Sequence, residues 1–291
     1  DIANQELSGD AKIRLDAARD SVVQIRGFFD QSASSAFHGS GFAVDDGRRI
    51  VTNYHVVAQA VLYPRQYRLE YLASDGRTGT LQVLAIDVRN DLAVVAAETL
   101  ELPPLKLRTG IPAQGERTWS IGFPLNLGLA ITEGVANGLV ESSVAQRIHY
   151  TGAINGGMSG GPALDTRGQV YGVNVSVVTG RQLVGFVVPA RHIPALLARA
   201  KEPLDQMLSA QQLRSRVTAQ VLAYEAEVLE AAPDATRTQV VRGYTVPTQI
   251  SRHVECSAVD ERGPHVRVRM ETVSCWIPAS ITAQAGVSVA G

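Results

Sequence analysis

The chain has few cysteines, few aromatic side chains and almost no excess of charge. Its 291 residues include two cysteines and 5% aromatic residues, and the formal net charge is −1. Because phosphate binding needs a basic surface, this charge balance argues against a nucleic-acid partner. No apolar run approaches the ~20 residues that cross a bilayer, so a membrane span is not expected. Hydrophobic residues make up 45% of the chain, which predicts a core of mainly aliphatic side chains.

The two cysteines, Cys256 and Cys275, both lie near the C-terminal end. They are either two buried free thiols or one disulfide that closes a small β-rich segment. We favour the disulfide, which would stabilise a loop of this size by ~3 kcal/mol and would imply an oxidising compartment. Neither cysteine has a Cys or His partner at metal-ligand spacing, so no metal site is expected.

The distribution of apolar residues divides the chain into four parts. Between about residues 21 and 188, short runs rich in Val, Ile, Leu and Tyr are separated by Gly, Asp and Asn, which is typical of a β-sandwich or of β-barrels. Apolar residues recur at helical spacing from Pro203 to Ala232. We therefore expect a mainly β protein with a helical lead-in, a β domain, a helical connector and a small β-rich C-terminal segment, at residues 1–19, 20–201, 202–235 and 236–291.

The stretch INGGMSGGPALD, residues 154–165, surrounds Ser159 with four glycines and a proline. In most proteins Gly and Pro next to Ser mark an ordinary surface turn. The alternative is a backbone shaped for catalysis around a nucleophilic serine. A serine hydroxyl is barely ionised at neutral pH, so this alternative requires a base, usually a histidine that a carboxylate orients.

His55 and Asp91 are the best candidates for these two roles. His55 ends the strand-like run RRIVTNYHVV, and the end of a buried strand would hold a general base rigidly. Asp91 stands at the head of the apolar run LAVVAA, where a carboxylate can face the interior, whereas Asp87 precedes the turn VRN and is expected to be a solvated turn former. Each residue alone has an ordinary structural explanation, but the order His55, Asp91, Ser159 in a β-rich domain favours a catalytic set.

With this order, the chain resembles the chymotrypsin-like serine proteases, and among them the bacterial HtrA/Deg proteases. The matching stretches lie in the right order between about residues 21 and 198: GSGFAV, IVTNYHVV, DLAVV, SIGFP, ITEGVANGL, INGGMSGGPALD, VYGVNVSVV and GFVVPARHI. The resemblance implies two six-stranded antiparallel β-barrels of chymotrypsin type. It also implies a serine endopeptidase in which His55 is the general base, Asp91 its orienting partner and Ser159 the nucleophile.

The resemblance assigns further roles around the serine. In this family the backbone N–H groups of the serine and of the residue two positions before it form the oxyanion hole, here Ser159 and Gly157. The S1 pocket is lined by the residue six positions before the serine, Ala153, and by the strand at 172–177, where Val175 would pair with the substrate as an added strand. No charge stands at these positions, so we predict cleavage after small or medium aliphatic P1 residues.

The sequence departs from the family pattern in two places. Secreted trypsins have an aspartate just before the serine that pairs with a new N-terminus, whereas this chain has Met158 there. We therefore hypothesise that activity needs no zymogen cleavage and depends on how the loop at residues 149–157 settles. HtrA proteases usually carry PDZ domains after the protease domain, and residues 202–291 contain no recognisable PDZ motif.

Two other functions compete with this interpretation. The stretch GMSGG also fits the nucleophile elbow of α/β-hydrolases, with Asp165 and His192 as partners, but Gly-Gly-Pro cannot start a good helix and no upstream βαβ pattern is present. The second alternative is a catalytically silent or switchable protease fold that acts as a protein-binding scaffold.

The resemblance also bears on partners and location. No cofactor is implied, because three side chains and backbone amides suffice for acyl transfer. The expected partners are protein or peptide substrates, with residues 202–291 available for a homo-oligomer contact or a partner protein. The expected disulfide and the family's habit indicate an extracytoplasmic location, in a bacterial periplasm or outside the cell.

Overall fold

The computed structural model of the chain describes residues 9–124, 127–140, 145–175, 185–200, 208–231, 237–241, 243–249, 255–261, 270–276, 281–284 and 287–289. The elements that form the first half of the fold are α1 (Gly9–Arg19), β1 (Val22–Phe29), β2 (Ser35–Val44), β3 (Arg49–Thr52), α2 (Tyr54–Leu62), β4 (Tyr67–Ala73), β5 (Thr78–Asp87) and β6 (Leu92–Ala96). The next elements are β7 (Glu116–Gly122), β8 (Ala130–Leu139), β9 (Ile148–Tyr150), β10 (Pro162–Leu164), β11 (Val170–Val175), β12 (Gly185–Pro189), η2 (Ala190–His192) and α3 (Ile193–Arg199). The last are α4 (Ala210–Ala231), β13 (Arg237–Val241), β14 (Tyr244–Gln249), β15 (Glu255–Glu261), β16 (Met270–Trp276), β17 (Ile281–Gln284) and β18 (Val287–Val289).

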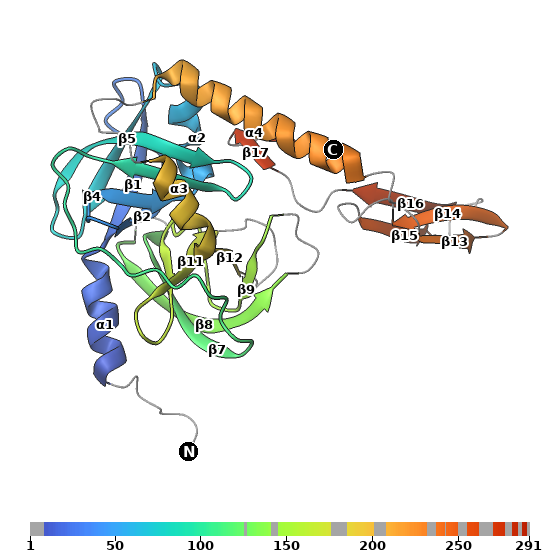
Figure 1. The fold of residues 1–291 in the computed structure, drawn as a ribbon, viewed down its shortest axis with the longest axis horizontal. Coiled ribbons are helices and arrows are strands. Elements are labelled where there is room, and N and C mark those ends of the chain that lie inside the picture. Colours follow the sequence, from blue (N-terminus) through green and yellow to red (C-terminus); the bar gives the residue numbers. More distant parts are fainter. Residues whose placement is uncertain are drawn as a thin grey trace.

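Strands β1–β12 form two closed barrels, which lie one above the other in Figure 1. The strand order is β1-β2-β3-β6-β5-β4 in the first barrel and β10-β11-β12-β9-β8-β7 in the second. Neighbouring strands of each barrel are antiparallel. The mainly β class and the two six-stranded antiparallel barrels expected from the sequence are confirmed.

Strand β6 shows why the apolar runs of the barrels are continuous. All five residues Leu92–Ala96 are buried. Ala93 and Val95 belong to the apolar cluster of the first barrel, whereas the alternate residues belong to a second cluster that also contains Trp119 of β7. Because successive side chains of a strand point to opposite faces, this strand is covered on one face by its own barrel and on the other by the second barrel.

One local prediction is wrong, because His55 does not end a strand. Strand β3 ends at Thr52, Asn53 has the extended backbone of a helix N-cap, and α2 follows, with His55 in its first turn. Val57 and Val61 lie one helical turn apart and are fully buried in the cluster of the first barrel. This packing outweighs the β propensity of the valines.

Helix α4 begins at Ala210, after Leu208 and Ser209, which are not helical. The Ser209 N–H donates to Gln212 Oε1 (2.7 Å), and the Gln212 N–H donates to Ser209 Oγ (3.3 Å). This reciprocal capping box fixes the start of the helix. The sequence predicted a helix from Pro203, but residues 201–207 lie outside the described residues.

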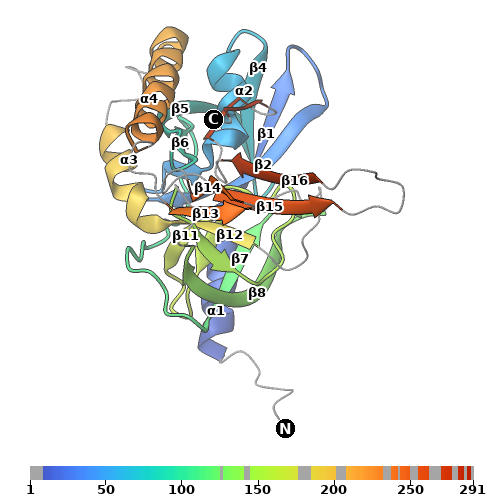
Figure 2. The same cartoon turned by 90° about the vertical axis from the view of Figure 1, so that its right-hand side faces the viewer.

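Helix α4 packs on the outside of the first barrel. Leu213, Val217 and Tyr224 are buried in the same cluster as α2, and Figure 2 shows α3 and α4 on the same side of the molecule. No helix in the described part of the chain is long and apolar enough to cross a membrane.

The strands after α4 pair as three hairpins, β13–β14, β15–β16 and β17–β18, in agreement with the expected β-rich C-terminal segment. Figure 1 shows the first two beyond the C-terminal end of α4 and away from the barrels, whereas β17 contacts α2 and α4. In the β15–β16 hairpin, Cys256 stands directly opposite Cys275.

Candidate active site

His55 and Asp91 form a close pair. His55 Nδ1 and Asp91 Oδ2 are 2.8 Å apart, and the His55 backbone N–H donates to Asp91 Oδ1 (2.9 Å). Both carboxylate oxygens are therefore directed at one residue, and the side chains are only 29% and 15% exposed. Because Nδ1 faces the carboxylate, Nε2 is the ring nitrogen left to exchange a proton with a nucleophile.

Asp91 lies in the turn between β5 and β6 and has a left-handed backbone, with φ of 59°. Its N–H donates to the carbonyl of Val88 (3.2 Å), and its carbonyl accepts from Asn53 Nδ2 (2.8 Å). Asn53 thus uses its side chain to join the Asp91 turn to the start of the helix that carries His55. A left-handed backbone is uncommon for a residue other than glycine and is kept by such contacts.

Asp87 forms a turn as expected, but it is not solvated. Its Oδ1 accepts the Asn90 N–H (3.0 Å), and its Oδ2 pairs with Arg199 Nη2 (3.2 Å). The side chain is only 14% exposed, because α3, which carries Arg199, covers this turn. Asp87 therefore joins the Asp91 turn to α3 through Asn90 and Arg199.

The charge of Asp91 tunes the basicity of His55. Burial lowers the pKa of the imidazole, but the negative charge of Asp91 and the hydrogen bond to it outweigh burial, so the pKa lies above its ordinary value. The positive charge of Arg147 works in the opposite direction and limits this rise. Burial lowers the pKa of the Arg147 guanidinium, although Asp91 and Asp87 partly offset that effect.

Residues 155–158 form a tight turn before the serine. The Met158 N–H donates to the Asn155 carbonyl (3.0 Å), and Gly157, at the third position, has φ of 95°. Positive φ at this position alone is typical of a type II turn, which needs glycine there. A Cβ added at Gly157 would lie 2.3 Å from the Phe123 carbonyl oxygen. The turn therefore fixes the direction of the Gly157 N–H, one of the two expected oxyanion donors.

Ser40, in β2 of the first barrel, holds this turn in place. Its buried hydroxyl donates to the Gly157 carbonyl (2.7 Å) and accepts the Phe123 N–H (3.0 Å). Its backbone N–H donates to the Ser159 carbonyl (2.7 Å). Two hydrogen bonds from one residue of the first barrel thus fix the serine loop of the second barrel.

The serine loop lies against the start of the histidine helix. Ser159 is 5% exposed. A Cβ added at the next residue, Gly160, would lie 2.1 Å from the Ser40 carbonyl oxygen and 2.2 Å from Thr52 Oγ1. Thr52 is the last residue of β3, three positions before His55. The structure therefore brings Ser159 and the His55–Asp91 pair to the same boundary between the barrels.

The predicted S1 residues lie on either side of the serine loop. Ala153 is exposed, and its carbonyl accepts from Thr132 Oγ1 (2.9 Å). Val175 is partly buried at the end of β11, opposite Phe186 of β12. The rest of the predicted pocket strand, beyond Val175, lies outside the described residues.

Sequence analysis missed an aliphatic side chain at this place. Ile154 packs against Gly185 of β12, where an added Cβ would lie 3.0 Å from Ile154 Cδ1. Ile154 therefore lies in close contact with Gly185, and a larger residue at position 185 would require the Ile154 side chain to shift.

The pair proposed for an α/β-hydrolase does not form a site. Asp165 is buried in the turn between β10 and β11 and pairs with Arg108 (3.1 Å), whereas His192 Nε2 lies 3.0 Å from Gln146 Oε1. The barrels are also antiparallel, whereas that fold needs a parallel sheet with helical crossovers. This alternative is not supported.

Three other residues that hold or influence the pair and the turn were also missed. Ser40 and Asn53 occur within GSGFAV and IVTNYHVV, two of the stretches that carry the family resemblance, so closer attention to these stretches would have found them. Nothing in the sequence around Arg147 places it near Asp91, because β9 and the β5–β6 turn belong to different barrels.

Comparison with known proteins agrees with this geometry. Residues 39–173 match the family model of the trypsin-like peptidase domain. The chain is 34% identical over 180 residues to a probable periplasmic serine endoprotease DegP-like of Chlamydia trachomatis. This match covers 60% of this chain and 34% of that protein. It is 32% identical over 184 residues to the mitochondrial serine protease HTRA2 of Drosophila pseudoobscura, which covers 60% of this chain and 42% of that protein. The chain thus spans less than half the length of these curated relatives.

Solved structures show the same fold. The structure of Deg5 has a TM-score of 0.55 at 28% identity and covers 65% of this chain and 93% of that chain. A serine endoprotease from Yersinia pestis has a TM-score of 0.57 at 24% identity, covers 67% of this chain and 68% of that chain, and supports the fold alone. Residues 39–173 are therefore similar to a trypsin-like peptidase domain, and the two-barrel fold is similar to that of Deg5.

Proposed function

We propose that the chain is a serine endopeptidase that works through an acyl-enzyme on Ser159. Ser159 Oγ attacks the scissile carbonyl carbon while His55 Nε2 takes its proton, and Asp91 stabilises the imidazolium. The N–H groups of Gly157 and Ser159 hold the oxyanion. The intermediate collapses and expels the amine, which receives the proton from His55. Water, deprotonated by His55, then attacks the ester and releases the acid and Ser159.

The observation that carries this proposal is the assembled His55–Asp91 pair next to a turn that only glycine can form at Gly157. A protein-binding scaffold would need neither a shielded carboxylate bonded to an imidazole nor a glycine-only conformation two residues before a serine. The named relatives, a probable serine endoprotease and a serine protease, support the same activity.

For specificity, the proposal is cleavage after small or medium aliphatic P1 residues. Ala153 carries no charge, and Ile154 fills space against Gly185, so a pocket here would be shallow and apolar. A long cationic P1 side chain would find neither the depth nor a charged partner. The end of β11 at Val175 would pair with the substrate backbone as an added strand.

For location, the proposal is an extracytoplasmic compartment. One named relative is described as periplasmic and another as mitochondrial. Directly opposed cysteines on antiparallel strands lie within disulfide reach, so Cys256 and Cys275 are proposed to form a bond. Alkylation followed by intact-mass measurement tests the bond, and two alkylated thiols in unreduced protein would contradict it. Residues 202–291 remain the proposed surface for a homo-oligomer contact or a partner protein.

The decisive experiment is labelling with a fluorophosphonate, followed by mass spectrometry to locate the adduct. We expect one adduct on Ser159 that is lost in His55→Ala and in Ser159→Ala. Casein should be degraded by the wild type and not by Ser159→Ala, and a peptide library should show cleavage after Val, Ala or Leu. Absence of both labelling and cleavage would favour the scaffold, and cleavage mainly after Arg or Lys would overturn the specificity.

A further inference from the structure

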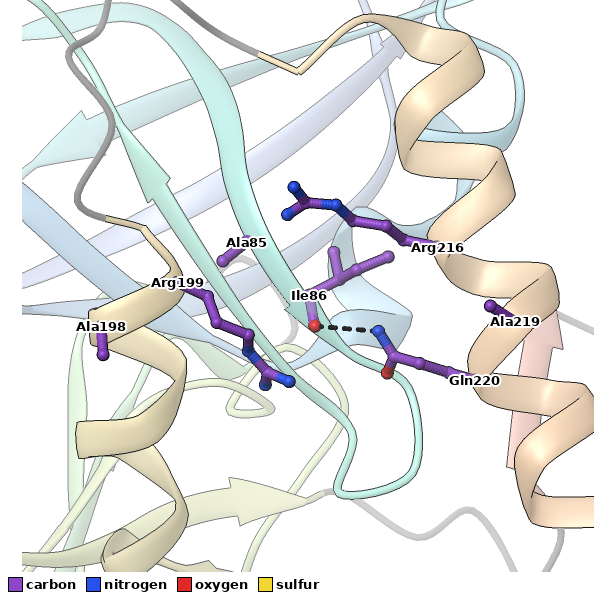
Figure 3. A pocket seen from close by; sticks show the side chains of 7 residues that line it. All are labelled: Ala85, Ile86, Ala198, Arg199, Arg216, Ala219 and Gln220. Carbon is purple, nitrogen blue, oxygen red and sulfur yellow. Dashed lines mark hydrogen bonds between the residues drawn. The ribbon is translucent and has the colours of Figure 1, made fainter.

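The turn that carries Asp91 is held from outside the barrels by α4. Gln220 Oε1 accepts the Val88 N–H (2.7 Å), and Gln220 Nε2 donates to the Ile86 carbonyl (3.2 Å), as Figure 3 shows for the second bond. One side-chain amide therefore pairs with a backbone donor and a backbone acceptor two residues apart. This is the pairing that a neighbouring strand would supply at the end of β5.

A second contact lies two helical turns further along α4. Arg89, the next residue of the same turn, donates to Glu227 through two hydrogen bonds of 2.6 and 3.0 Å. The two side chains are 42% and 29% exposed, so the pair contributes little to the free energy of unfolding. Its main effect is to fix the position of the turn relative to α4. Gln220 and Glu227 are seven residues apart and share one face of the helix. That face therefore forms hydrogen bonds with Ile86, Val88 and Arg89.

The face of α4 that carries Gln220 is only partly packed, because it borders a cleft. A cleft of about 470 Å³ separates α3 from α4 and is lined by side chains of β5, α3 and α4, including Arg199 and Arg216 (Figure 3). Gln220 lies at the edge of this cleft. Its two hydrogen bonds and the Arg89–Glu227 pair are polar links between the helix and this segment, beside the apolar packing of Val88 in the cluster that also contains α4 residues.

Asp91 depends on this turn for its geometry. Its left-handed backbone (φ of 59°) is unfavourable for an aspartate in a free loop, and its N–H is bonded to the carbonyl of Val88. The Val88 N–H is in turn bonded to Gln220. A chain of two hydrogen bonds thus runs from α4 through Val88 to Asp91.

Helix α4 also contacts the helix that carries His55. Leu213, Val217 and Tyr224 of α4 are buried in one cluster with Tyr54 and Val57 of α2. The same element therefore touches the supports of both members of the His55–Asp91 pair.

We propose that α4 is a positioning element of the site, in which Gln220 and, to a smaller extent, Glu227 hold the Asp91 turn in its working conformation. The inference rests on the proposed peptidase function and names what controls the same site. It also makes α4 the physical link between the C-terminal hairpins and the His55–Asp91 pair, because these hairpins follow directly from the helix.

The test compares Gln220→Ala with Gln211→Ala in the full chain. Gln211 is exposed on the same helix. Gln211→Ala therefore also removes a glutamine side chain but leaves the two hydrogen bonds of Gln220 in place. We expect Gln220→Ala to lower kcat/KM about tenfold, mostly through kcat, because small displacements of a catalytic group are costly. The acid limb of the pH profile should move to lower pH, since a displaced Asp91 supports the imidazolium less. Gln220→Glu, which keeps the acceptor for Val88, should recover part of the loss.

A titration of His55 by NMR supplies a readout that does not need activity. The pKa of His55 should fall in Gln220→Ala and stay at the wild-type value in Gln211→Ala. Glu227→Gln should show a smaller fall than Gln220→Ala, with the exposed Glu230→Gln as its control. Equal pH profiles and equal His55 pKa values for Gln220→Ala and Gln211→Ala would overturn the positioning role. A wild-type protein that neither labels nor cleaves would instead count against the peptidase proposal, while the NMR comparison would still decide the role of α4.

Discussion

The two barrels supply different kinds of group to the proposed site. The first barrel supplies side chains, since His55 and Asp91 are bonded to each other within it (2.8 Å). The second barrel supplies the Ser159 hydroxyl together with backbone donors, since the turn at residues 155–158 fixes a peptide N–H through a glycine with positive φ. A side-chain group is lost when a substitution removes its functional atom, and it also works poorly after a small backbone shift. A backbone donor is lost only when a substitution changes the conformation of the chain.

The barrels are also supported differently. The Asp91 turn is held by α3 and α4, which are outside both barrels. The serine loop is held by Ser40 of the opposite barrel. Substitutions that loosen the Asp91 turn should therefore change the proton-transfer step, whereas substitutions that loosen the serine loop, including those at Ser40, should change stabilisation of the oxyanion.

The largest effect is expected for Asp91→Asn. The His55 backbone N–H requires an oxygen at Oδ1, so the new amide group must face Nδ1. The imidazole then carries its proton on Nε2 and cannot accept the proton of Ser159. We expect kcat to fall by about 10⁴, measured with a chromogenic peptide. Asp87→Asn is the control, and a loss of similar size there would show that the wrong aspartate has been assigned.

Gly157→Ala tests the backbone side of the comparison. The alanine Cβ would approach the Phe123 carbonyl oxygen to 2.3 Å, so the turn must change and withdraw one oxyanion donor. A loss of about 10²–10³ in kcat is expected, with KM little changed. Gly115→Ala provides the control, because Gly115 also has positive φ but has open space around it. If both variants lose the same activity, backbone strain rather than the site explains the loss.

A smaller effect is expected for Ser40→Ala, which breaks the link between the barrels. Removal of the hydroxyl leaves the Gly157 carbonyl and the Phe123 N–H without their partner. Unfolding by urea should show a loss of about 1–3 kcal/mol, and kcat should fall about tenfold as the turn loosens. Ser120→Ala is the matched control, because the buried hydroxyl of Ser120 has no hydrogen-bond partner among the described residues. Equal stability of the two variants would contradict the bridging role.

The smallest effect is expected in the pH dependence of activity and stability. Since the pKa of His55 is raised, kcat/KM should rise with pH through a value above the ordinary imidazole pKa, and Asp91→Asn should move this limb to lower pH. A raised pKa means that protonated His55 stabilises the fold. This stabilisation is fully present below the pKa of the unfolded state and is lost as pH rises through the folded-state pKa. Thermal unfolding of the two proteins at about pH 5 and about pH 8 checks the sign, and a larger difference at the higher pH would contradict it.

The family resemblance indicated which residues form the candidate site, but the sequence predicted their local structure less well. Short apolar runs indicated a β-sandwich or β-barrels, and the family resemblance implied two barrels and a candidate site of His55, Asp91 and Ser159. The strand assigned to His55 was wrong, because a valine-rich run has the same composition in a strand as in a short buried helix, and the packing of Val57 and Val61 decides between them. Asp87 was expected to be solvated, because the sequence does not show that α3 returns to cover it.

The sequence by itself determined the chemistry that is available: a serine among glycines, one histidine and one aspartate in a family order, and an excess of short aliphatic strands. Only the tertiary structure decided how these groups are held. Ser40 and Gly157 are 117 residues apart in the chain, and Val88 and Gln220 are 132 residues apart. Contacts over such separations leave no local pattern, because they depend on how the barrels close and where α4 packs. Hydrogen bonds from distant elements therefore set the turn of Asp91 and the turn of Gly157, which the residue types alone do not specify.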